Sequence, residues 1–140
     1  MIEFARPEDE AFVYRLICDL EEADLDRGSF GQVYEEYLTR SDIYCLVWRE
    51  AGEAAAVLAM RVGPALSRAG KVAEITELVV KQTLRSKGIG HQLFLRAQMI
   101  AKEEGCARLE VDSNQKRVDA HRFYEREGMR KTHFKLVKSL

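Results

Sequence analysis

Apolar residues recur every three to four positions in two long segments of the chain. The first segment follows Pro7, where residues 12–20 form one apolar stripe at helical spacing. The second covers residues 89–104 and is followed by Gly105, the residue type that most often ends a helix. Both patterns predict amphipathic α-helices, each with one face directed at a core.

Shorter runs rich in β-branched and aromatic residues predict strands, and Ala51-Gly52 predicts a hairpin turn between two of them. A loop is expected from Gly63-Pro64 to Gly70. In chain order, the predicted elements are a strand at 2–6, a helix from Pro7, a helix at 30–38, strands at 43–49, 54–62 and 72–80, a helix at 89–104, a strand at 108–112, a helix at 119–126 and a strand at 131–137.

This order of elements predicts an α/β fold with a mixed central sheet and helices on both of its faces. The chain shows no internal repeat, low-complexity tract or linker. We therefore expect a single domain over residues 1–140.

The composition agrees with a globular protein of the cytoplasm. Hydrophobic residues make up 46% of the 140 positions, and no run approaches the length of a membrane span. The first residues lack the basic and apolar pattern of a signal sequence. Cys18, Cys45 and Cys106 are odd in number and have no metal-ligand spacing, so reduced thiols are expected.

Charge is distributed unevenly along the chain. Residues 1–60 carry 14 acidic and 5 basic side chains, and residues 61–140 carry 9 acidic and 17 basic ones. The acidic part could attract a cationic amine, although an uneven solvated surface is the plainer interpretation. No basic module with interleaved aromatic residues is present, so nucleic acid is not an expected partner.

The segment Arg85-Ser86-Lys87-Gly88-Ile89-Gly90 lies between a β-branched run and an amphipathic segment, which predicts a strand-to-helix turn. The start of a helix exposes N–H groups without partners, and its dipole favours an anion. Glycines let the backbone come close to a bulky ligand. The spacing fits neither a Walker loop nor a dinucleotide fingerprint, so the turn predicts a phosphate-bearing ligand of another kind.

Two motifs resemble those of the GNAT superfamily of N-acetyltransferases. The first is the Arg-x-x-Gly-x-Gly turn at residues 85–90. The second is Asn114 followed by Ala120-His121-Arg122-Phe123-Tyr124-Glu125-Arg126-Glu127-Gly128, with Met129 where the superfamily usually has Phe. Within the superfamily, the segments that resemble the aminoalkylphosphonate N-acetyltransferases are 16–20, 74–80, 116–124 and 133–135.

The resemblance implies the acyl-CoA N-acyltransferase fold, acetyl-CoA as cosubstrate and acetyl transfer to a primary amine by direct attack in a ternary complex. The turn would hold the diphosphate of acetyl-CoA, with charge added by Arg85 and Lys87. Val79 N–H would bind the thioester oxygen, and Leu78 and Val80 would line the pantetheine arm. The implied cofactor-binding residues are Leu78, Val79, Val80, Arg85, Lys87, Gly88, Ile89, Gly90, His91, Asn114 and Tyr124.

Tyr124 and Glu77 are the candidate catalytic residues. By resemblance, Tyr124 would protonate the leaving thiolate, because a phenol has a pKa near about 10 and a thiol near about 8.5. Glu77 would be the general base, since a carboxylate among apolar neighbours has a raised pKa. Positions 74 and 77 point to opposite faces of a regular strand, and a bulge would bring Glu74 and Glu77 closer. A base that acts through water stays open.

A phosphonate substrate needs cations or a metal ion opposite its two negative charges. By resemblance, the cations that would bind the phosphonate are Lys116, Arg117 and His133. Glu74 is a further candidate substrate-binding residue, because its strand is expected to face the substrate. A divalent metal ion is left open, because no recognisable ligand spacing is present. Its conceivable ligands are Glu77, His121 and His133.

Other functions remain open from the sequence. The same chemistry could act on an aminoglycoside, a polyamine, an amino acid or a protein N-terminus. A non-catalytic acyl-CoA-binding module that regulates a partner is a different class, which the complete turn and Tyr124 argue against. Exposed sheet edges also leave a homodimer open.

Overall fold

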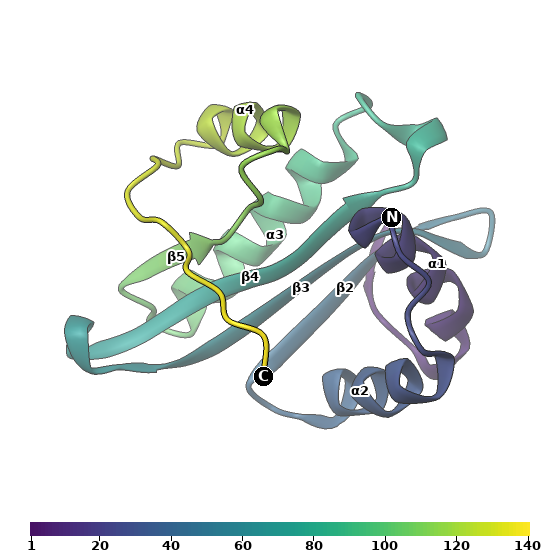
Figure 1. The fold of residues 1–140 in the computed structure, drawn as a ribbon, viewed down its shortest axis with the longest axis horizontal. Helices are drawn as coiled ribbons and strands as arrows, with labels where there is room; N and C mark the ends of the chain where they lie inside the picture. Colours follow the sequence, from purple (N-terminus) through teal and green to yellow (C-terminus); the bar gives the residue numbers. More distant parts are fainter. The chain divides into compact units, whose positions relative to one another are not determined.

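The computed structural model describes all residues from 1 to 140, and Figure 1 shows the order of its elements. The strands are β1 (Ile2–Phe4), β2 (Ile43–Glu50), β3 (Glu53–Ala65), β4 (Gly70–Val80) and β5 (Arg108–Val111). The α-helices are α1 (Glu10–Glu21), α2 (Arg27–Thr39), α3 (Ile89–Glu103) and α4 (Val118–Arg126). Three short 3-10 helices are η1 (Pro7–Asp9), η2 (Leu66–Arg68) and η3 (Gln82–Leu84).

The chain forms two compact parts, Met1–Glu110 and Val111–Leu140. The first part contains almost the whole sheet with α1, α2 and α3, and the second contains α4 and the C-terminal segment. Each part is described by itself below. The expectation of one domain over residues 1–140 stays a prediction.

The sheet has the strand order β1-β2-β3-β4-β5, and its first four strands are antiparallel neighbours. The β2–β3 connection is the predicted hairpin, with Ala51 and Gly52 at φ of 49° and 81°. Positive φ at both positions matches the type I′ turn that suits the twist of a hairpin. The long α3 connection between β4 and β5 completes the mixed α/β fold that the sequence predicted.

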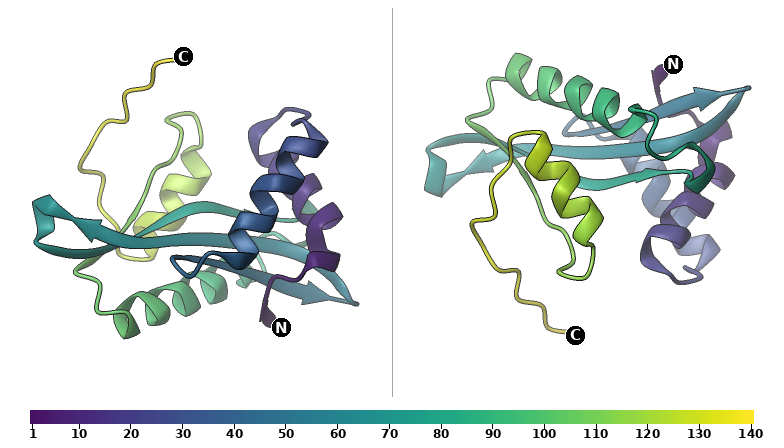
Figure 2. Two further views of the ribbon diagram at one scale, coloured as in Figure 1. Left: turned by 90° about the horizontal axis from the view of Figure 1, so that it is seen from below. Right: turned by 90° about the horizontal axis from the view of Figure 1, so that it is seen from above.

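Helices cover both faces of the sheet within residues 1–110. The left view of Figure 2 shows α1 and α2 on one face and α3 on the other. Because side chains alternate along a strand, Cys45 and Val57 point towards α1 and α2, whereas Leu58 points towards α3. Leu93 and Phe94 of α3 are fully buried against that second face. The alternation therefore builds two apolar layers from the same three central strands.

Two predicted boundaries differ from the structure by three residues. Helix α2 begins at Arg27 rather than at residue 30, because the Asp26 carboxylate accepts a hydrogen bond from Ser29 N–H and caps the helix. Strand β3 continues through the expected loop at Gly63-Pro64 and ends at Ala65. Proline is tolerated there because β2 no longer pairs with that stretch, which leaves one edge of β3 free.

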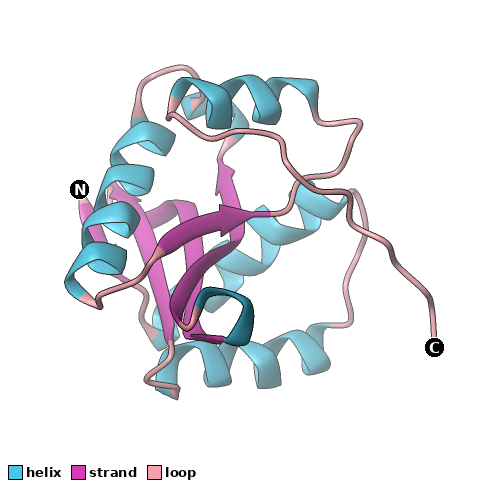
Figure 3. Ribbon diagram, turned by 90° about the vertical axis from the view of Figure 1, so that its left-hand side faces the viewer, coloured by secondary structure: helices cyan, strands magenta, loops and turns pink.

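The predicted C-terminal strand at 131–137 is wrong. Figure 3 shows the chain after α4 as irregular, and every residue from 131 to 140 is exposed. Alternating apolar residues form a strand only where a neighbouring strand satisfies the backbone N–H and C=O groups. No such neighbour pairs with this segment, so the alternation of Phe134 and Leu136 has no sheet to join.

A buried ion pair connects the first residues of the chain to the sheet. Arg49 Nη1 and Nη2 of β2 donate to the two carboxylate oxygens of Asp9 at 2.8 and 2.9 Å, and Arg49 Nε donates to Glu3. The Asp9 residue is only 2% exposed. Burial by itself would raise the pKa of Asp9, but the hydrogen bonds from Arg49 and from Arg6 N–H outweigh it and lower that pKa.

We expect Arg49→Met to lower the free energy of unfolding by about 3 kcal/mol at pH 7, because it leaves a buried carboxylate without its partner. The lowered pKa means that Asp9 stabilises the fold above its unfolded-state pKa near 3.8 and loses this effect as the pH falls through the folded-state value. Urea unfolding of the wild-type protein and the Arg49→Met variant between pH 7 and pH 3 measures this. The difference between their free energies of unfolding should become smaller as the pH falls.

The matched control for this change is Arg40→Met, which removes an exposed pair with Asp42 at 2.6 Å. Side chains of that pair are 49% and 40% exposed, so the loss of stability should be much smaller than for Arg49→Met. Equal losses in the two variants would contradict the special role of the Arg49–Asp9 pair.

Candidate functional site

A β-bulge on β4 brings its two glutamates to the same face of the sheet. Ala59 of β3 lies opposite Glu77, and its neighbour Met60 lies opposite Ile75, so Thr76 is an extra residue on β4. Glu74 and Glu77 then pair with Arg61 and Ala59, which share one face because they are two residues apart. This is the bulge that the sequence analysis considered.

Glu77 lies on the face that α1 and α2 cover. The Thr76 hydroxyl donates to Glu77 Oε2 at 2.5 Å, and the Tyr37 hydroxyl lies 3.4 Å from both carboxylate oxygens. Burial raises the pKa of Glu77, and the bonds from Thr76 and Tyr37 oppose this only in part. A carboxylate with a raised pKa among apolar groups is a suitable proton acceptor near neutral pH.

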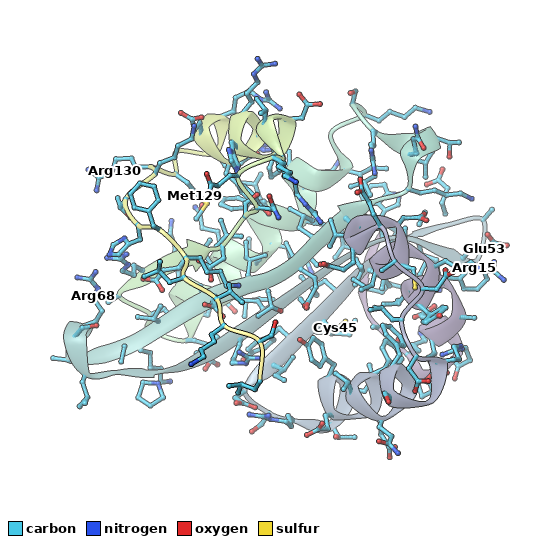
Figure 4. All side chains as sticks on the ribbon, in the orientation of Figure 1. Arg15, Cys45, Glu53, Arg68, Met129 and Arg130 are labelled. Carbon is cyan, nitrogen blue, oxygen red and sulfur yellow. The ribbon has the colours of Figure 1, made fainter.

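A cavity of about 330 Å³ opens in front of Glu77. Its walls come from α1, α2 and the strands β2, β3 and β4, all within residues 1–110. Cys45, labelled in Figure 4, contributes to the wall from β2, and Tyr37 contributes from α2. Burial raises the pKa of the Cys45 thiol to about 12, so this cysteine stays protonated and acts as an apolar wall residue.

Glu74 does not line the cavity. Its carboxylate lies 3.8 Å from Arg61 Nη1, and its side chain is 39% exposed. The bulge therefore places both glutamates on one face but only Glu77 in the cavity wall. A substrate-binding role of Glu74 stays a prediction.

The pairing of β4 with β3 corrects one detail of the expected site. Lys81 N–H donates to Ala55 O at 2.8 Å, and hydrogen-bonded pairs alternate with non-bonded pairs along an antiparallel ladder. Val79 is two residues before Lys81 and pairs with Val57, so it belongs to the next hydrogen-bonded pair. Its N–H therefore points at β3 and cannot bind a thioester oxygen. The N–H groups of Leu78 and Val80 point to the opposite edge of β4.

Within residues 1–110, no strand other than β3 pairs with β4 beside Leu78 and Val80, and we call the side of β4 away from β3 its open edge. Ala107 N–H donates to Lys71 O at 2.8 Å, which sets β5 next to the start of β4. With only four residues, β5 is too short to reach Leu78. An extended ligand could therefore bind along the last residues of β4 as an additional strand.

The turn after β4 has the backbone geometry of an anion site. Ser86 and Gly88 have φ of 62° and 81°, and α3 begins at Ile89 with Gly88 as its N-cap. No side chain caps this helix, so its first N–H groups, including those of Ile89 and Gly90, are donors for a ligand. Gln92 N–H already donates to Gly88 O at 3.1 Å and marks the end of this set.

Two cations border the turn. Arg85 Nε donates to Val80 O at 3.1 Å, which holds the guanidinium against the end of β4. Lys87 and His91 are exposed on either side of the N-cap. A Cβ built on Gly88 would meet no atom within 4 Å, so the space in front of the turn is open. Donors, charge and open space together suit the diphosphate of a nucleotide.

The part from Val111 to Leu140 contains Tyr124 on α4. The Tyr124 ring packs edge-to-face against Phe123, with 5.3 Å between the ring centroids. Burial raises the pKa of Tyr124 to about 12, although the charge of Arg117 acts in the opposite direction. The phenol is therefore fully protonated at neutral pH, as a general acid must be.

Asn114 builds the turn that leads into α4. Its side-chain oxygen accepts from Lys116 N–H at 3.0 Å, and its backbone oxygen accepts from Arg117 N–H at 3.0 Å and contacts His121 Nε2 at 2.9 Å. Asn114 therefore stabilises the turn before α4, and its contact with pantetheine stays a prediction. His133 lies in the exposed C-terminal segment, where the Thr132 hydroxyl is 2.6 Å from its Nδ1.

Neither a metal site nor a membrane-spanning helix is found. No three histidine, cysteine, aspartate or glutamate side chains come together in a way that could hold a metal ion. The proposed ligand set of Glu77, His121 and His133 therefore has no support in the structure. None of the helices has the length and apolar character that crossing a bilayer requires.

The match to a family model agrees with this geometry. Residues 10–129 match the model of the acetyltransferase (GNAT) family, which covers most of the chain. The chain belongs to the GNAT family of acetyltransferases. Acetyl-CoA is thus the cosubstrate of the family to which this enzyme belongs, and the open turn at Gly88 fits its diphosphate.

Individual relatives cover the chain almost completely. The aminoalkylphosphonate N-acetyltransferase of Salmonella typhimurium is 34% identical over 139 residues, which are 99% of this chain and 90% of that protein. A crystal structure named a transcriptional regulator from Bacillus halodurans has a TM-score of 0.92 at 24% identity and covers 100% and 99% of the two chains. A Trypanosoma brucei acetyltransferase has a TM-score of 0.83 at 22% identity, with the same coverage. The two structures establish the likeness of fold.

Sequence reasoning did not identify Thr76, Tyr37 or the cavity. Tyr37 is 40 positions away from Glu77 and belongs to no motif, so only the packing of α2 against the sheet brings them together. Thr76 is the extra residue of the bulge, and nothing in its spacing distinguishes it from its neighbours. Cavity residues look like ordinary core residues in the sequence.

We expect Gly88→Trp to weaken acetyl-CoA binding at least tenfold, because the ring would occupy the space in front of the turn. Gly52→Trp is the matched control, since Gly52 has the same φ of 81° and equally open surroundings in the β2–β3 hairpin. Both variants should lose a similar ~1–2 kcal/mol of stability from the strained backbone. Calorimetric titration with acetyl-CoA measures the affinity, and undiminished binding by the Gly88 variant would refute the placement of the diphosphate.

Proposed function

We propose that this acetyltransferase moves the acetyl group directly from acetyl-CoA to the primary amine of a small molecule, in a ternary complex. The observation that carries this proposal is the position of Glu77, a carboxylate with a raised pKa in the wall of a mostly apolar cavity. A protonated amine cannot attack a thioester before it loses a proton, and in this proposal Glu77 accepts that proton.

In this proposal the thioester is held at the end of β4. The Leu78 N–H points to the open edge and donates to the carbonyl oxygen, which develops negative charge during attack. Val80 and Arg85 border the pantetheine arm, and the N–H groups of residues 87–91 bind the diphosphate. Asn114 remains a candidate for contact with the arm.

Tyr124 protonates the departing thiolate in the same proposal. Its pKa of about 12 exceeds that of a free thiol near about 8.5, so proton transfer to sulfur is favourable. A phenol that stays protonated over the whole working pH range is ready for each turnover. The proposal therefore assigns the role of proton acceptor to Glu77 and the role of proton donor to Tyr124.

An aminoalkylphosphonate is the amine that we propose first. The support is the relative of that name at 34% identity over nearly the full chain. Lys116, Arg117 and His133 of residues 111–140 are the cations proposed for the phosphonate. Other primary amines, among them aminoglycosides, polyamines, amino acids and protein N-termini, remain as alternatives.

The amine is identified by measuring coenzyme A release with a panel of these acceptors, with and without divalent ions. The fastest turnover should come from an aminoalkylphosphonate. Tight acetyl-CoA binding without turnover on any amine would favour the non-catalytic regulatory module instead. Cytoplasmic location and a homodimer stay predictions.

We expect Glu77→Gln to lower kcat/KM by about 100-fold or more, because it removes the proton acceptor. The wild-type enzyme should lose activity in acid at a pH above the ordinary glutamate pKa of 4.5, because burial raises the pKa of Glu77. The pH profile of kcat/KM measures this acidic limb, which should disappear in the Gln variant.

A second variant, Tyr37→Phe, tests whether the acidic limb of the pH profile follows the pKa of Glu77. The Tyr37 hydroxyl lowers the pKa of Glu77, so its removal should move the acidic limb to higher pH and leave the activity at high pH nearly unchanged. An acidic limb that stays in place in both variants would show that Glu77 is not the base.

We expect Tyr124→Phe to lower kcat by about 10- to 100-fold and to change the affinity for the amine little, because only the departing thiolate needs the proton. Steady-state kinetics of acetyl transfer separate the two quantities. Turnover equal to wild type would remove the acid role of Tyr124.

A further inference from the structure

The cavity in front of Glu77 has almost entirely apolar walls. Val13 and Ile17 of α1, Phe30 and Val33 of α2, and Val57 and Ala59 of β3 face it. These residues come from two helices and a strand, so the apolar lining extends around the cavity and is not confined to one side. A ligand that enters it meets hydrocarbon in most directions.

The polar groups of the lining have hydrogen-bond partners, but Glu77 can accept more hydrogen bonds than it receives. The Tyr34 hydroxyl donates to Arg6 O at 2.7 Å, and the Asp26 carboxylate accepts from Ser29 N–H as the cap of α2. Glu77 has two oxygens and only the hydroxyls of Thr76 and Tyr37 beside them. A carboxylate can accept about four hydrogen bonds, so Glu77 can still bind an ammonium group.

No lysine, arginine or histidine belongs to the cavity lining, which instead contains the carboxylates of Asp26 and Glu77. A phosphonate placed inside would face two negative charges without a counterion, which is strongly unfavourable in apolar surroundings. A second ammonium group, as in a polyamine, would be buried against hydrocarbon. Within the cavity, only an uncharged apolar group fits beyond the amine.

We propose that this cavity binds an apolar substituent next to the reacting amine, so that the enzyme prefers acceptors with an aliphatic or phenylalkyl group over unsubstituted ones. This proposal rests on the proposed acetyl transfer and names the substrate class for it. Any phosphonate of the substrate lies outside the cavity. The preferred phosphonate acceptors are therefore 1-aminoalkylphosphonates with a bulky apolar side chain.

The size of the cavity agrees with this assignment. An apolar cavity of about 150 Å³ is large enough to bind benzene. The cavity of this chain has about 330 Å³, so a phenyl ring and a connecting methylene fit beside the amine. Each buried methylene should raise kcat/KM roughly threefold to fourfold, and a benzyl group about thirtyfold.

Four acceptors test the proposal as two matched pairs. Aminomethylphosphonate and 1-amino-2-phenylethylphosphonate differ by one benzyl group, and so do methylamine and 2-phenylethylamine. Coenzyme A release at saturating acetyl-CoA gives kcat/KM for each. We expect the benzyl group to raise kcat/KM about thirtyfold in both pairs, and no increase in either pair would overturn the proposal.

Two variants tie the preference to the cavity. Ala59→Leu fills the cavity from β3, and Val33→Lys adds a cation to its wall from an exposed position of α2. Both should remove the benzyl preference, which is measured in each variant as the ratio of kcat/KM within a matched pair of acceptors. Met99→Lys is the matched control for the second variant, because Met99 is a similarly exposed apolar residue on α3, on the other face of the sheet.

Because Ala59 is buried, thermal unfolding must first show that Ala59→Leu is folded, and the conclusion rests on Val33→Lys if it is not. A benzyl preference that persists in folded variants would contradict the assignment of the cavity.

Binding measurements separate this proposal from acetyl transfer itself. Calorimetric titration with 2-phenylethylamine should show binding to the wild-type protein and to Met99→Lys, and at least tenfold weaker binding to Val33→Lys. If none of the four amines is acetylated but this pattern of binding is found, acetyl transfer to such amines fails and the apolar cavity stands. If the amines are acetylated without benzyl preference and 2-phenylethylamine does not bind, the cavity proposal alone fails.

Discussion

The extra residue Thr76 in β4 is the constraint on which the candidate site depends. A regular strand would send Glu74 and Glu77 to opposite faces, and Glu77 would then lie on the side of α3. The bulge shifts the register by one residue, so Glu77 joins Ala59 on the face that α1 and α2 cover. It also leaves the Thr76 hydroxyl beside the Glu77 carboxylate, 2.5 Å away. One inserted residue therefore sets the position of the proposed base and gives its carboxylate a hydrogen-bond donor.

In the proposed reaction, β4 binds the amine at one face and the thioester at one edge. Its face towards α1 and α2 presents Glu77 to the cavity, and its open edge presents Leu78 N–H beyond the end of β5. The turn that follows begins α3 with donors for a diphosphate. Glu77 and Leu78 are adjacent residues of one strand, so an amine bound at the first and a thioester bound at the second are held close together.

Much of the fold could be predicted because the local signals agree with the tertiary structure. The helical spacing of residues 89–104 and Gly105 correctly predicted α3, and Ala51-Gly52 correctly predicted the hairpin. Errors arose where a neighbour decides the outcome. Residues 131–137 alternate like a strand but have no strand to pair with, and β3 continues through Pro64 because β4 supports it. The role expected for the Val79 N–H was wrong because the pairing of β4 with β3 decides which N–H groups point at β3. The sequence of one strand does not contain this information.

The sequence alone determined the family, the turn at residues 85–90 and the identity of Glu77 and Tyr124 as candidates, because these signals are local and consist of residue types at fixed spacing. Only the tertiary structure decided that Tyr37 lies beside Glu77, that Leu78 rather than Val79 faces the open edge, and that apolar residues enclose the cavity. These features arise from contacts between segments that are dozens of residues apart. The packing of helices on a sheet creates such contacts, and no local pattern encodes them.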